Sequence, residues 1–303
     1  MNIQNLVLNK YCPICKSQNV KDKKKIKSKH FEINLVFSLK KCLDCCHRFL
    51  SKFPTEKDLF ELYKNNSKFV FGHEFNEESE KNKFRNAGFN SISPYSEHWI
   101  FKFINISQPG EYFEIGPGLC RLYKTFYEKK WNCEGFDFQP FIKGPGIVDD
   151  LKDIIDNSKD VAVALDVLEH TINPNKTLTV LNKKLKVGGK LFLSFPYSDS
   201  FKSRFLNNKW NMIVPLAHLN FFSKKSIKIL LKYSNFKVIY LKNYSLADPK
   251  KFTKNLLRLP FRLFKDLIFF NFLKFFNRIK ETIITFLDLI NGDQMIVVAI
   301  KIK

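Results

Sequence analysis

The stretch EYFEIGPGLC, residues 111–120, decides the fold of this chain. A short apolar run over 112–115 leads into Gly-Pro-Gly at 116–118, and a helix-like segment covers 119–130. A glycine at the tip of a strand permits a turn in which a side chain would clash, and a second glycine lets a ligand lie against bare backbone at the start of a helix. The stretch therefore predicts a strand, a ligand-binding turn and a helix, in that order.

A second acidic residue points to a nucleoside ligand. Asp137 ends the next apolar run, in GFDFQP, 23 positions after Glu114. Nucleoside-binding α/β folds place a carboxylate there, where it accepts hydrogen bonds from ribose hydroxyls. Arg121 stands where the G-x-G-x-x-G fingerprint needs its third glycine, which argues against NAD and for a shorter two-glycine turn.

The surrounding segments alternate between strand-like and helix-like patterns. Strand-like runs cover 112–115, 134–138, 161–165 and 190–195, and helix-like runs cover 119–130, 139–143 and 174–186. This alternation predicts a parallel sheet with crossover helices, whose ligands bind at the carboxyl ends of the strands. Acidic residues fall near those ends, at Glu114, Asp137, Asp150 and Asp166.

Four blocks in a fixed order carry a resemblance to a known family. E-I-G-P-G, G-F-D, L-D-V-L-E-H and L-K-V-G-G-K-L-F-L-S-F-P together resemble the class I S-adenosylmethionine-dependent methyltransferases. The similarity spans about 110–245 and the last dozen residues. It implies an α/β, Rossmann-like methyltransferase sheet, mostly parallel with an antiparallel last strand.

The same resemblance implies roles for the residues of the cofactor site. The two glycines would let the methionine end approach the backbone, and Glu114 would organise that loop or accept from the ammonium group. Asp137 would hold the ribose hydroxyls, with an aromatic neighbour on the adenine face. Asp150 would receive the adenine amino group, with Asp149 as the other candidate. The predicted cofactor-binding residues are Glu114, Gly116, Gly118, Asp137, Phe138, Asp150 and Asp166.

Two histidines are candidates for the acceptor side. His170 follows the fourth predicted strand, and His218 lies in HLNFFS, a segment similar to the H-x-x-x-F-S block of saccharide-modifying relatives. Either imidazole can serve as the general base that deprotonates an acceptor hydroxyl. The block Asp166 to His170 also resembles E-x-x-E-H, which holds magnesium in some O-methyltransferases. Its first residue here is Asp166, whose side chain is one methylene shorter than the glutamate of that motif. The alternative is that Glu169 and His170 only shape the turn.

Residues 1–53 predict a small zinc-ribbon-like domain. Two C-x-x-C pairs, Cys12 with Cys15 and Cys42 with Cys45, are separated by residues 16–41. Two such knuckles close a tetrahedral zinc site, and four thiolate ligands make the metal structural. Cys46 and His47 are neighbouring residues that can replace a ligand. A redox dithiol is the poorer alternative, because that role needs a thioredoxin-like setting.

Composition sets the remaining expectations. The net charge of +22 suits nucleic acid or an anionic membrane, but the abundance of Lys, Asn, Ile and Phe also fits the bias of an AT-rich genome. The N-terminal residues lack the features of a signal peptide, and no uncharged apolar stretch approaches the ~18 residues of a membrane span. We therefore expect a cytoplasmic protein, with peripheral contact to the inner face of a membrane as an option. Residues 54–100 predict a helical connector or lid, whose polar stretch 72–91 precedes Tyr95, His98 and Trp99.

Residues 101–303 predict the methyltransferase domain, interrupted by a basic, aromatic insertion at 246–291. Between 261 and 290 apolar residues recur at three- and four-residue steps, which predicts one helical stripe. Nine Lys or Arg fall between 250 and 280. A basic amphipathic helix with surplus Phe suits an anionic membrane surface, whereas packing on the domain or on a second subunit is the alternative.

The sequence thus predicts a zinc-binding unit fused to an S-adenosylmethionine-dependent methyltransferase. The resemblance favours a saccharide acceptor, through O-methylation of a nucleotide- or lipid-linked surface sugar. RNA methylation is the alternative, which the Lys21–Lys29 cluster favours and the absence of an N-P-P-Y-like tetrapeptide weakens for amine-methylating enzymes. A non-catalytic scaffold that binds S-adenosylmethionine is the third hypothesis.

Overall fold

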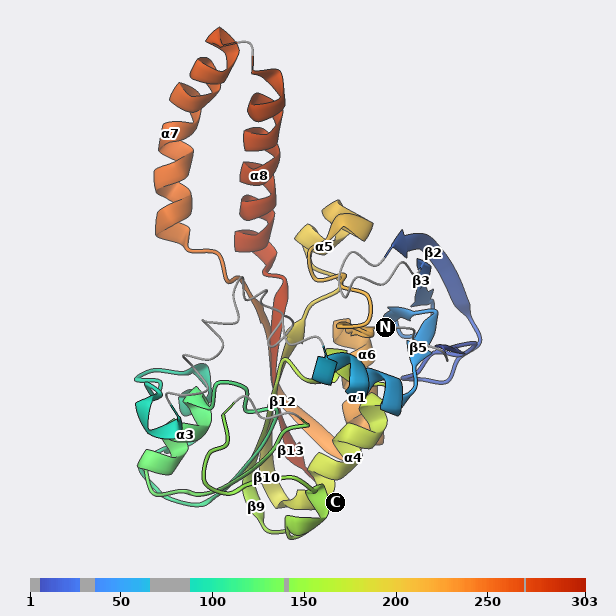
Figure 1. Cartoon of the computed structure of the whole chain (residues 1–303), viewed down its shortest axis with the longest axis vertical. Coiled ribbons are helices and arrows are strands. Elements are labelled where there is room, and N and C mark those ends of the chain that lie inside the picture. The colour runs from blue at the N-terminus through green and yellow to red at the C-terminus, as the bar shows by residue number, and fades with distance from the viewer. Residues whose placement is uncertain (1–5, 28–35, 66–87, 139–141, 270) are drawn as a thin grey trace.

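A computed structural model of the chain has a seven-stranded sheet at its centre (Figure 1). The structure describes residues 6–27, 36–65, 88–138, 142–269 and 271–303. The strands of the sheet are β6 (Glu111–Ile115), β7 (Asn132–Phe136), β8 (Ile147–Val148), β9 (Lys159–Leu165), β10 (Leu185–Pro196), β12 (Phe236–Tyr244) and β13 (Gln294–Lys301). Their spatial order is β12-β13-β10-β9-β6-β7-β8.

Strand direction agrees with the prediction from sequence. The five neighbours from β10 to β8 pair in parallel, whereas β13 pairs antiparallel with both β10 and β12. The mostly parallel sheet with an antiparallel last strand is therefore confirmed. Because β6, β7 and β9 are adjacent and parallel, their carboxyl ends meet at one edge of the sheet.

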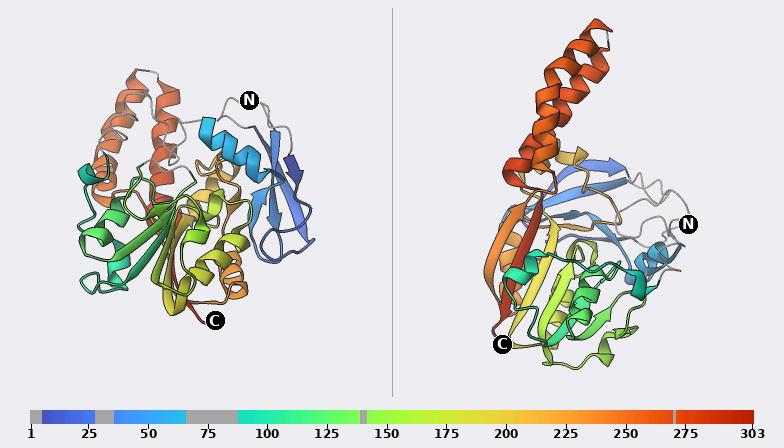
Figure 2. Two further views of the ribbon diagram at one scale, coloured as in Figure 1. Left: turned by 60° about the horizontal axis from the view of Figure 1, so that its bottom comes forward. Right: turned by 90° about the vertical axis from the view of Figure 1, so that its left-hand side faces the viewer.

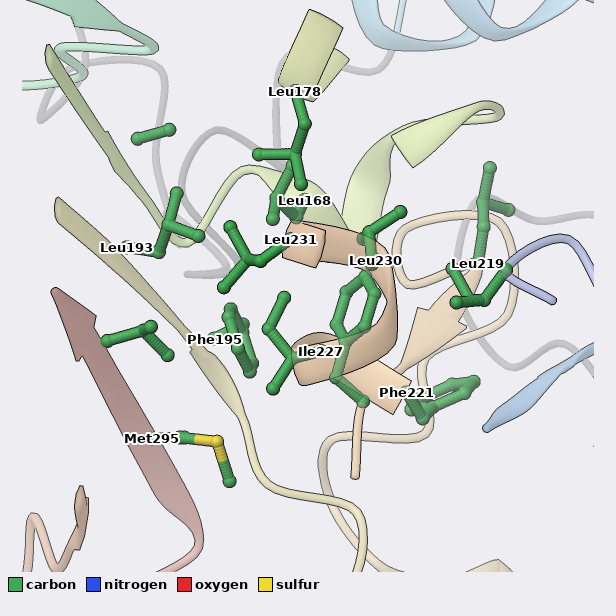
Figure 3. Packing of buried hydrophobic residues seen from close by; sticks show 14 of the residues in the cluster. Leu168, Leu178, Leu193, Phe195, Leu219, Phe221, Ile227, Leu230, Leu231 and Met295 are labelled. Carbon is green, nitrogen blue, oxygen red and sulfur yellow. The ribbon is translucent and has the colours of Figure 1, made fainter. Parts of the chain in front are cut away.

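Helices cover both faces of the sheet (Figure 2). The helices of the central fold are α3 (Arg121–Glu128), α4 (Pro174–Lys184), α5 (Phe201–Leu206) and α6 (Lys224–Tyr233). Alternate side chains of β10 point to opposite faces: Leu191, Leu193 and Phe195 share a core with α4 and α6, and Phe192 joins a second core with α3. Figure 3 shows the first of these cores. Strands buried on both faces explain their nearly continuous apolar sequences.

The connection after β7 differs from the expectation. Of the helix-like run predicted at 139–143, residues 139–141 lie outside the described residues, and residues 142 and 143 are not helical. The described remainder leads through a turn into β8 without a crossover helix. Short 3-10 turns occur elsewhere at η4 (Leu151–Asp153), η5 (Leu168–His170) and η6 (Asn207–Lys209).

The N-terminal unit shares a sheet with the rest of the protein. It contains β1 (Leu6–Leu8), β2 (Val20–Lys27), β3 (Val36–Cys42), β4 (Arg48–Leu50) and β5 (Lys52–Pro54). The short strand β11 (Asn220–Phe221), which comes from the C-terminal half of the chain, pairs antiparallel with β4. One hydrophobic core includes Phe49 of β4 and Phe221 of β11. The two units are therefore packed as one body.

The lysine-rich segment between the two cysteine pairs, whose composition suggests a solvated turn, is largely a strand. Lys21 to Lys27 belong to β2, which pairs with β3 at the edge of the four-stranded sheet. Consecutive lysines have low strand propensity, but an edge strand can leave such side chains, among them Lys21 and Lys25, exposed to solvent and still pair its backbone on one side. Residues 28–35 lie outside the described residues.

The connector begins with α1 (Glu56–Asn65) and ends with η2 (Phe89–Ser91) and η3 (Trp99–Lys102). Residues 66–87, which include most of the stretch expected as a lid, lie outside the described residues. Tyr95 packs against the guanidinium of Arg121, 4.3 Å from its ring centroid, and Trp99 packs on Phe192 of the sheet with centroids 5.8 Å apart. The described part of the connector thus covers the α3 face of the sheet.

The insertion forms two antiparallel helices and not one continuous stripe. They are α7 (Pro249–Ile268) and α8 (Phe272–Asn291), which make a long hairpin (Figure 1). The side chain of Asn271 accepts a hydrogen bond from the Lys274 backbone N–H at 3.3 Å and caps α8. The apolar periodicity continues through this break, so pattern alone did not reveal it. No helix among the described residues is both long enough and apolar enough to cross a membrane.

We predict that Ser223→Ala destabilises the fold by about 1–2 kcal/mol. Ser223 is the N-cap of α6 in a reciprocal capping box with Ser226, and its hydroxyl also donates to the Cys45 carbonyl at 3.0 Å. The measurement is urea unfolding beside Ser107→Ala, which alters an exposed serine. A Ser223→Ala curve that overlays the wild-type curve would contradict the prediction.

Candidate active site

The turn after β6 presents bare backbone. Gly116 and Gly118 both have left-handed φ angles, +68° and +53°, which favour glycine. The Gly116 N–H donates to the Phe136 carbonyl at 2.8 Å and so joins the turn to β7. A Cβ atom at Gly116 would lie 2.9 Å from Val167 Cγ2, so the turn also touches the segment after β9. Two glycines are thus needed here, as the sequence predicted.

Glu114 is buried behind this turn. It is 4% exposed and accepts a hydrogen bond from the Tyr112 hydroxyl at 2.7 Å. Burial raises the pKa of Glu114 to about 7, and the charge of Asp137 also raises it. This interaction shows that the structure brings Glu114 and Asp137 together, although they lie on different strands.

The other predicted cofactor residues lie along the same edge. Asp137 and Phe138 follow β7 directly, and the Phe138 side chain is 75% exposed. Asp150 follows β8 and caps η4 by accepting from the Lys152 N–H at 3.0 Å. Asp149 forms an ion pair with Lys143 at 2.9 Å. Both of the last two aspartates therefore have local partners.

Asp166 is fixed to the neighbouring strand. It has a left-handed φ of +53°, its N–H donates to the Ser194 carbonyl at 2.9 Å, and its Oδ1 accepts from the Ser194 hydroxyl at 3.0 Å. These bonds join the ends of β9 and β10. The Asp166 carboxylate therefore lies outside the cluster that Glu169, His170 and His218 form.

The structure brings the two candidate histidines together. The rings of His170 and His218 meet edge to face, with centroids 4.8 Å apart, although 48 positions separate them in sequence. The Nδ1 atoms lie 2.8 Å from the Ala217 carbonyl and 2.6 Å from the Met212 carbonyl, respectively. Since a carbonyl only accepts, each Nδ1 carries the hydrogen and each Nε2 is unprotonated in the neutral ring.

Burial keeps both rings neutral. It lowers the pKa of His218 to about 3, with a smaller contribution from His170, and it also lowers the pKa of His170. Glu169 lies beside them, 2% exposed, and its Oε2 has no hydrogen-bond partner among the described residues. Burial and the charge of Asp166 raise the pKa of Glu169 well above its usual value. The result is a largely buried cluster of one carboxyl group and two unprotonated imidazole nitrogens.

This cluster does not suit the magnesium ion that the sequence suggested. Ligand atoms of Glu169, His170 and His218 lie within 4.8 Å of one another. Mg²⁺ prefers oxygen ligands, whereas two of these three donors are imidazole nitrogens, and the Asp166 carboxylate is bonded to Ser194 instead. We therefore assign no step to magnesium.

The four predicted metal-binding cysteines converge. The Sγ atoms of Cys12 and Cys45 are 3.5 Å apart, and those of Cys15 and Cys42 are 3.6 Å apart. All four lie within 4.8 Å of one another. A tetrahedral zinc ion with Zn–S bonds of about 2.3 Å requires S–S separations of about 3.8 Å. The cluster therefore fits zinc as a closed, structural site.

The two knuckles have the same backbone geometry. The Lys16 N–H donates to the Cys12 carbonyl at 3.0 Å, and the Cys46 N–H donates to the Cys42 carbonyl at 3.1 Å. Lys16 and Cys46 share left-handed φ angles of +61° and +62°. Cys46 is thus a turn residue of its knuckle and is not in the four-cysteine cluster.

Contacts from the second knuckle reach the loop that carries His218. The His47 Nε2 lies 3.1 Å from Asn220 Oδ1, and Asn220 Nδ2 donates to the Thr171 carbonyl at 2.6 Å. The Leu50 N–H donates to the Leu219 carbonyl at 3.1 Å, while the Leu219 N–H donates to the Glu169 carbonyl at 2.7 Å. Sequence reasoning missed these links, because no local pattern marks a contact between segments so far apart.

Comparison with known proteins agrees with this geometry. Residues 96–241, just under half of the chain, match a family model described as a methyltransferase domain. This segment is a methyltransferase domain. The chain is accordingly an enzyme that uses S-adenosylmethionine as its methyl donor, as the sequence predicted. The glycine turn and the acidic residues at the strand ends fit that donor.

Solved methyltransferase structures resemble the chain only distantly. An S-adenosylmethionine-dependent methyltransferase from Archaeoglobus fulgidus is 17% identical, with a TM-score of 0.45 over 67% of this chain and 91% of that chain. The Haemonchus contortus phosphoethanolamine N-methyltransferase 2 is 14% identical, with a TM-score of 0.45 over 92% and 71% of the two chains. A methyltransferase from Mesorhizobium loti is 12% identical, with a TM-score of 0.45 over 66% and 94%. No curated protein matches the chain.

We predict that the purified methyltransferase contains one zinc ion per chain and that Cys45→Ser removes it. Structural zinc contributes on the order of 10 kcal/mol in small modules, so the variant should unfold at a markedly lower temperature. Cys46→Ser is the matched control and should retain the metal, because Cys46 lies outside the cluster. Metal content is measured by mass spectrometry. Equal zinc loss in both variants would show that the ligand set is different.

Proposed function

We propose that this methyltransferase O-methylates a hydroxyl group of a saccharide, with His218 as the general base. One observation carries the proposal: the Met212 carbonyl accepts a hydrogen bond from Nδ1 of His218, so that Nε2 is the ring atom that can accept a proton. A sugar hydroxyl must lose its proton as it attacks a methyl group, whereas a neutral amine needs no base for the attack. The buried imidazole therefore favours an alcohol as the acceptor.

The donor is proposed to bind along the carboxyl edge of β6, β7 and β8. Gly116 and Gly118 would admit its methionine end to the backbone, while Glu114, fixed by its bond from the Tyr112 hydroxyl, would organise the loop or accept from the ammonium group. Asp137 would bind both ribose hydroxyls. Phe138 would lie on the adenine, which its exposed ring supports, and Asp150 and Asp166 would border the site.

Proximity of donor and acceptor is supported by one contact. Val167, one residue after Asp166, touches Gly116 of the donor turn, and Glu169 and His170 follow Val167 directly. Holding two reactants in line can contribute roughly 7–11 kcal/mol in favourable cases. A donor seated on the glycine turn would thus have its methyl group close to the histidine cluster.

The proposed reaction is an in-line displacement. S-adenosylmethionine supplies an electrophilic methyl group on a positively charged sulfur. The acceptor oxygen forms a bond to the methyl carbon as the bond to sulfur breaks, and the hydroxyl proton passes to Nε2 of His218. The adjacent carboxyl group of Glu169, although burial raises its pKa, would stabilise the imidazolium that forms when it is ionised, since opposite charges in a buried site favour each other.

RNA methylation is the second candidate, favoured by the exposed lysines on the edge strand β2, among them Lys21 and Lys25. A panel of nucleotide-linked sugars and total RNA, tested with labelled S-adenosylmethionine, separates the two. Label in RNA would contradict the saccharide proposal. Cofactor binding without label in any acceptor would favour the non-catalytic scaffold.

For the donor site we predict that Asp137→Asn weakens S-adenosylmethionine binding by about 10- to 100-fold. The loss corresponds to one or two hydrogen bonds to a charged carboxylate. Calorimetric titration is the measurement, with Asp22→Asn as the control, because Asp22 lies on β2 in the N-terminal unit. An unchanged affinity in Asp137→Asn would place the ribose elsewhere.

For the acceptor site we predict that His218→Asn lowers kcat by about 10²- to 10⁴-fold. The asparagine amide can still donate to the Met212 carbonyl but supplies no base, so affinity for the donor should change less than threefold. The assay follows methyl transfer to the best saccharide of the panel. His170→Asn serves as the comparison, and a larger loss in that variant would transfer the role of base to His170.

A further inference from the structure

The hairpin of α7 and α8 stands out from the body of the protein, with its turn at the far end (Figures 1 and 2). Its base is firmly attached. Asp288 of α8 is 4% exposed and accepts hydrogen bonds from the Ser245 hydroxyl at 2.8 Å and from the Asp293 N–H at 3.0 Å. A rigid base with a projecting tip allows the turn to reach a surface that the sheet itself does not touch.

The outer half of the hairpin, residues 261–276, exposes apolar side chains. Each is large and at least 43% exposed: Phe261, Phe264, Leu267, Ile268, Phe269, Phe272, Leu273 and Phe276. The two most exposed residues beside the turn are Phe269 at 70% and Leu273 at 75%. A contiguous apolar surface of this kind is rare on soluble proteins and marks an interaction site.

Charge is distributed differently along the hairpin. The inner half of α7 carries exposed basic residues at Lys250, Lys251, Lys254 and Arg258. In the outer half the exposed charges are Lys265 and Lys274, whose long side chains can extend toward a polar boundary. The exposed basic residues of α7 thus concentrate in its inner half, where Leu257 is also exposed, whereas the half beside the turn exposes mainly apolar side chains.

Its acidic residues are largely withdrawn from the surface. The sequence of the two helices contains nine Lys or Arg and three acids, Asp266, Glu281 and Asp288. Asp266 is 6% exposed and accepts from Arg278 Nε at 2.6 Å, which joins the two helices below the turn. With Asp288 also buried, Glu281 is the exposed acid of the described hairpin residues.

We propose that the outer half of this hairpin inserts into one leaflet of an anionic membrane. The eight residues from Phe261 to Ile268 extend about 12 Å as a helix, comparable to the ~15 Å hydrocarbon depth of one leaflet. The basic inner half of α7 would then lie at the lipid phosphates. Each exposed lysine near such a surface strengthens binding, and each buried apolar side chain adds to it.

The charge of the hairpin indicates that its apolar surface contacts a membrane and not a second copy of the chain. Two hairpins packed side by side along their length would bring their basic inner halves, with Lys250, Lys251 and Lys254, against each other, which is unfavourable. An anionic membrane offers negatively charged headgroups to the lysines and a hydrocarbon interior to the apolar side chains. This inference is independent of the acceptor that the methyltransferase uses.

The test is flotation of the full-length protein with phosphatidylcholine vesicles, with and without phosphatidylglycerol. We expect binding to the anionic vesicles, and at least a tenfold loss of partitioning in the double variant Phe269→Ser, Leu273→Ser. The control is Ile155→Ser with Val187→Ser, two side chains on the body that are 72% and 70% exposed. The control should bind as the wild type does.

Two further variants separate insertion from adsorption. Replacement of Lys250, Lys251 and Lys254 by Gln should reduce binding to anionic vesicles by about tenfold or more and leave neutral vesicles unaffected. Phe269→Trp should be quenched by lipids brominated on the acyl chain. Calorimetric titration with S-adenosylmethionine verifies that each variant remains folded and separates this result from the proposed catalysis.

The opposite outcomes would overturn the proposal. They are equal partitioning of the tip variant and the wild type, or no binding to anionic vesicles by a protein that binds its cofactor. A dimer in light scattering that disappears in the tip variant, without vesicle binding, would assign the apolar surface to a second copy.

Discussion

The structure depends on the close contact between Gly116 and Val167. The donor turn has a left-handed backbone at Gly116, and the space where a Cβ atom would lie ends 2.9 Å from the Val167 side chain. A larger residue would strain the left-handed backbone and would clash with Val167 unless that side chain shifted. Because that segment continues into Glu169 and His170, the contact places the glycine turn, where the donor is proposed to bind, beside the segment that leads to the histidine cluster. A reaction that depends on in-line alignment requires such a constraint.

The N-terminal unit supports the acceptor side of this arrangement. Strand β11 pairs with β4, so the loop that contains His218 is held on one side by the zinc-ribbon-like unit. On the other side the Leu219 N–H is bonded to the Glu169 carbonyl. The cysteine cluster thus does more than stabilise a separate module, since the knuckle at Cys45 supports the loop whose imidazole is proposed to accept a proton. Burial of His47 lowers its pKa to about 3, so this support does not change with pH near neutrality.

Local sequence signals predicted much of the fold and part of the site. Gly116, Asp137 and the four cysteines carry information in their immediate spacing. Long-range features were not predictable in the same way. The pairing of β11 with β4 joins residues about 170 positions apart, and no local pattern specifies it. The meeting of His170 and His218 likewise depends on the order of strands in the sheet.

Two errors have a common physical origin. An apolar period of three to four residues continues through Asn271, so periodicity indicated one helix where a single capping residue divides it into two. The lysines of β2 favour solvent, so composition indicated a turn where an edge strand also satisfies them. In both cases the overall pattern of residue types in the segment was clearer than the feature that determines its structure, which is the cap at Asn271 in one case and the edge position of β2 in the other. The roles of the cofactor residues remain proposals that the fold makes geometrically reasonable.

A crystal structure of the protein with S-adenosylhomocysteine would test the central claim most directly. The account predicts that the ribose hydroxyls lie against Asp137, that the amino acid end follows the backbone from Gly116 to Gly118, and that the sulfur faces the His170 and His218 rings. A nucleoside bound away from the β6 turn, or a sulfur that faces away from both histidines, would contradict it.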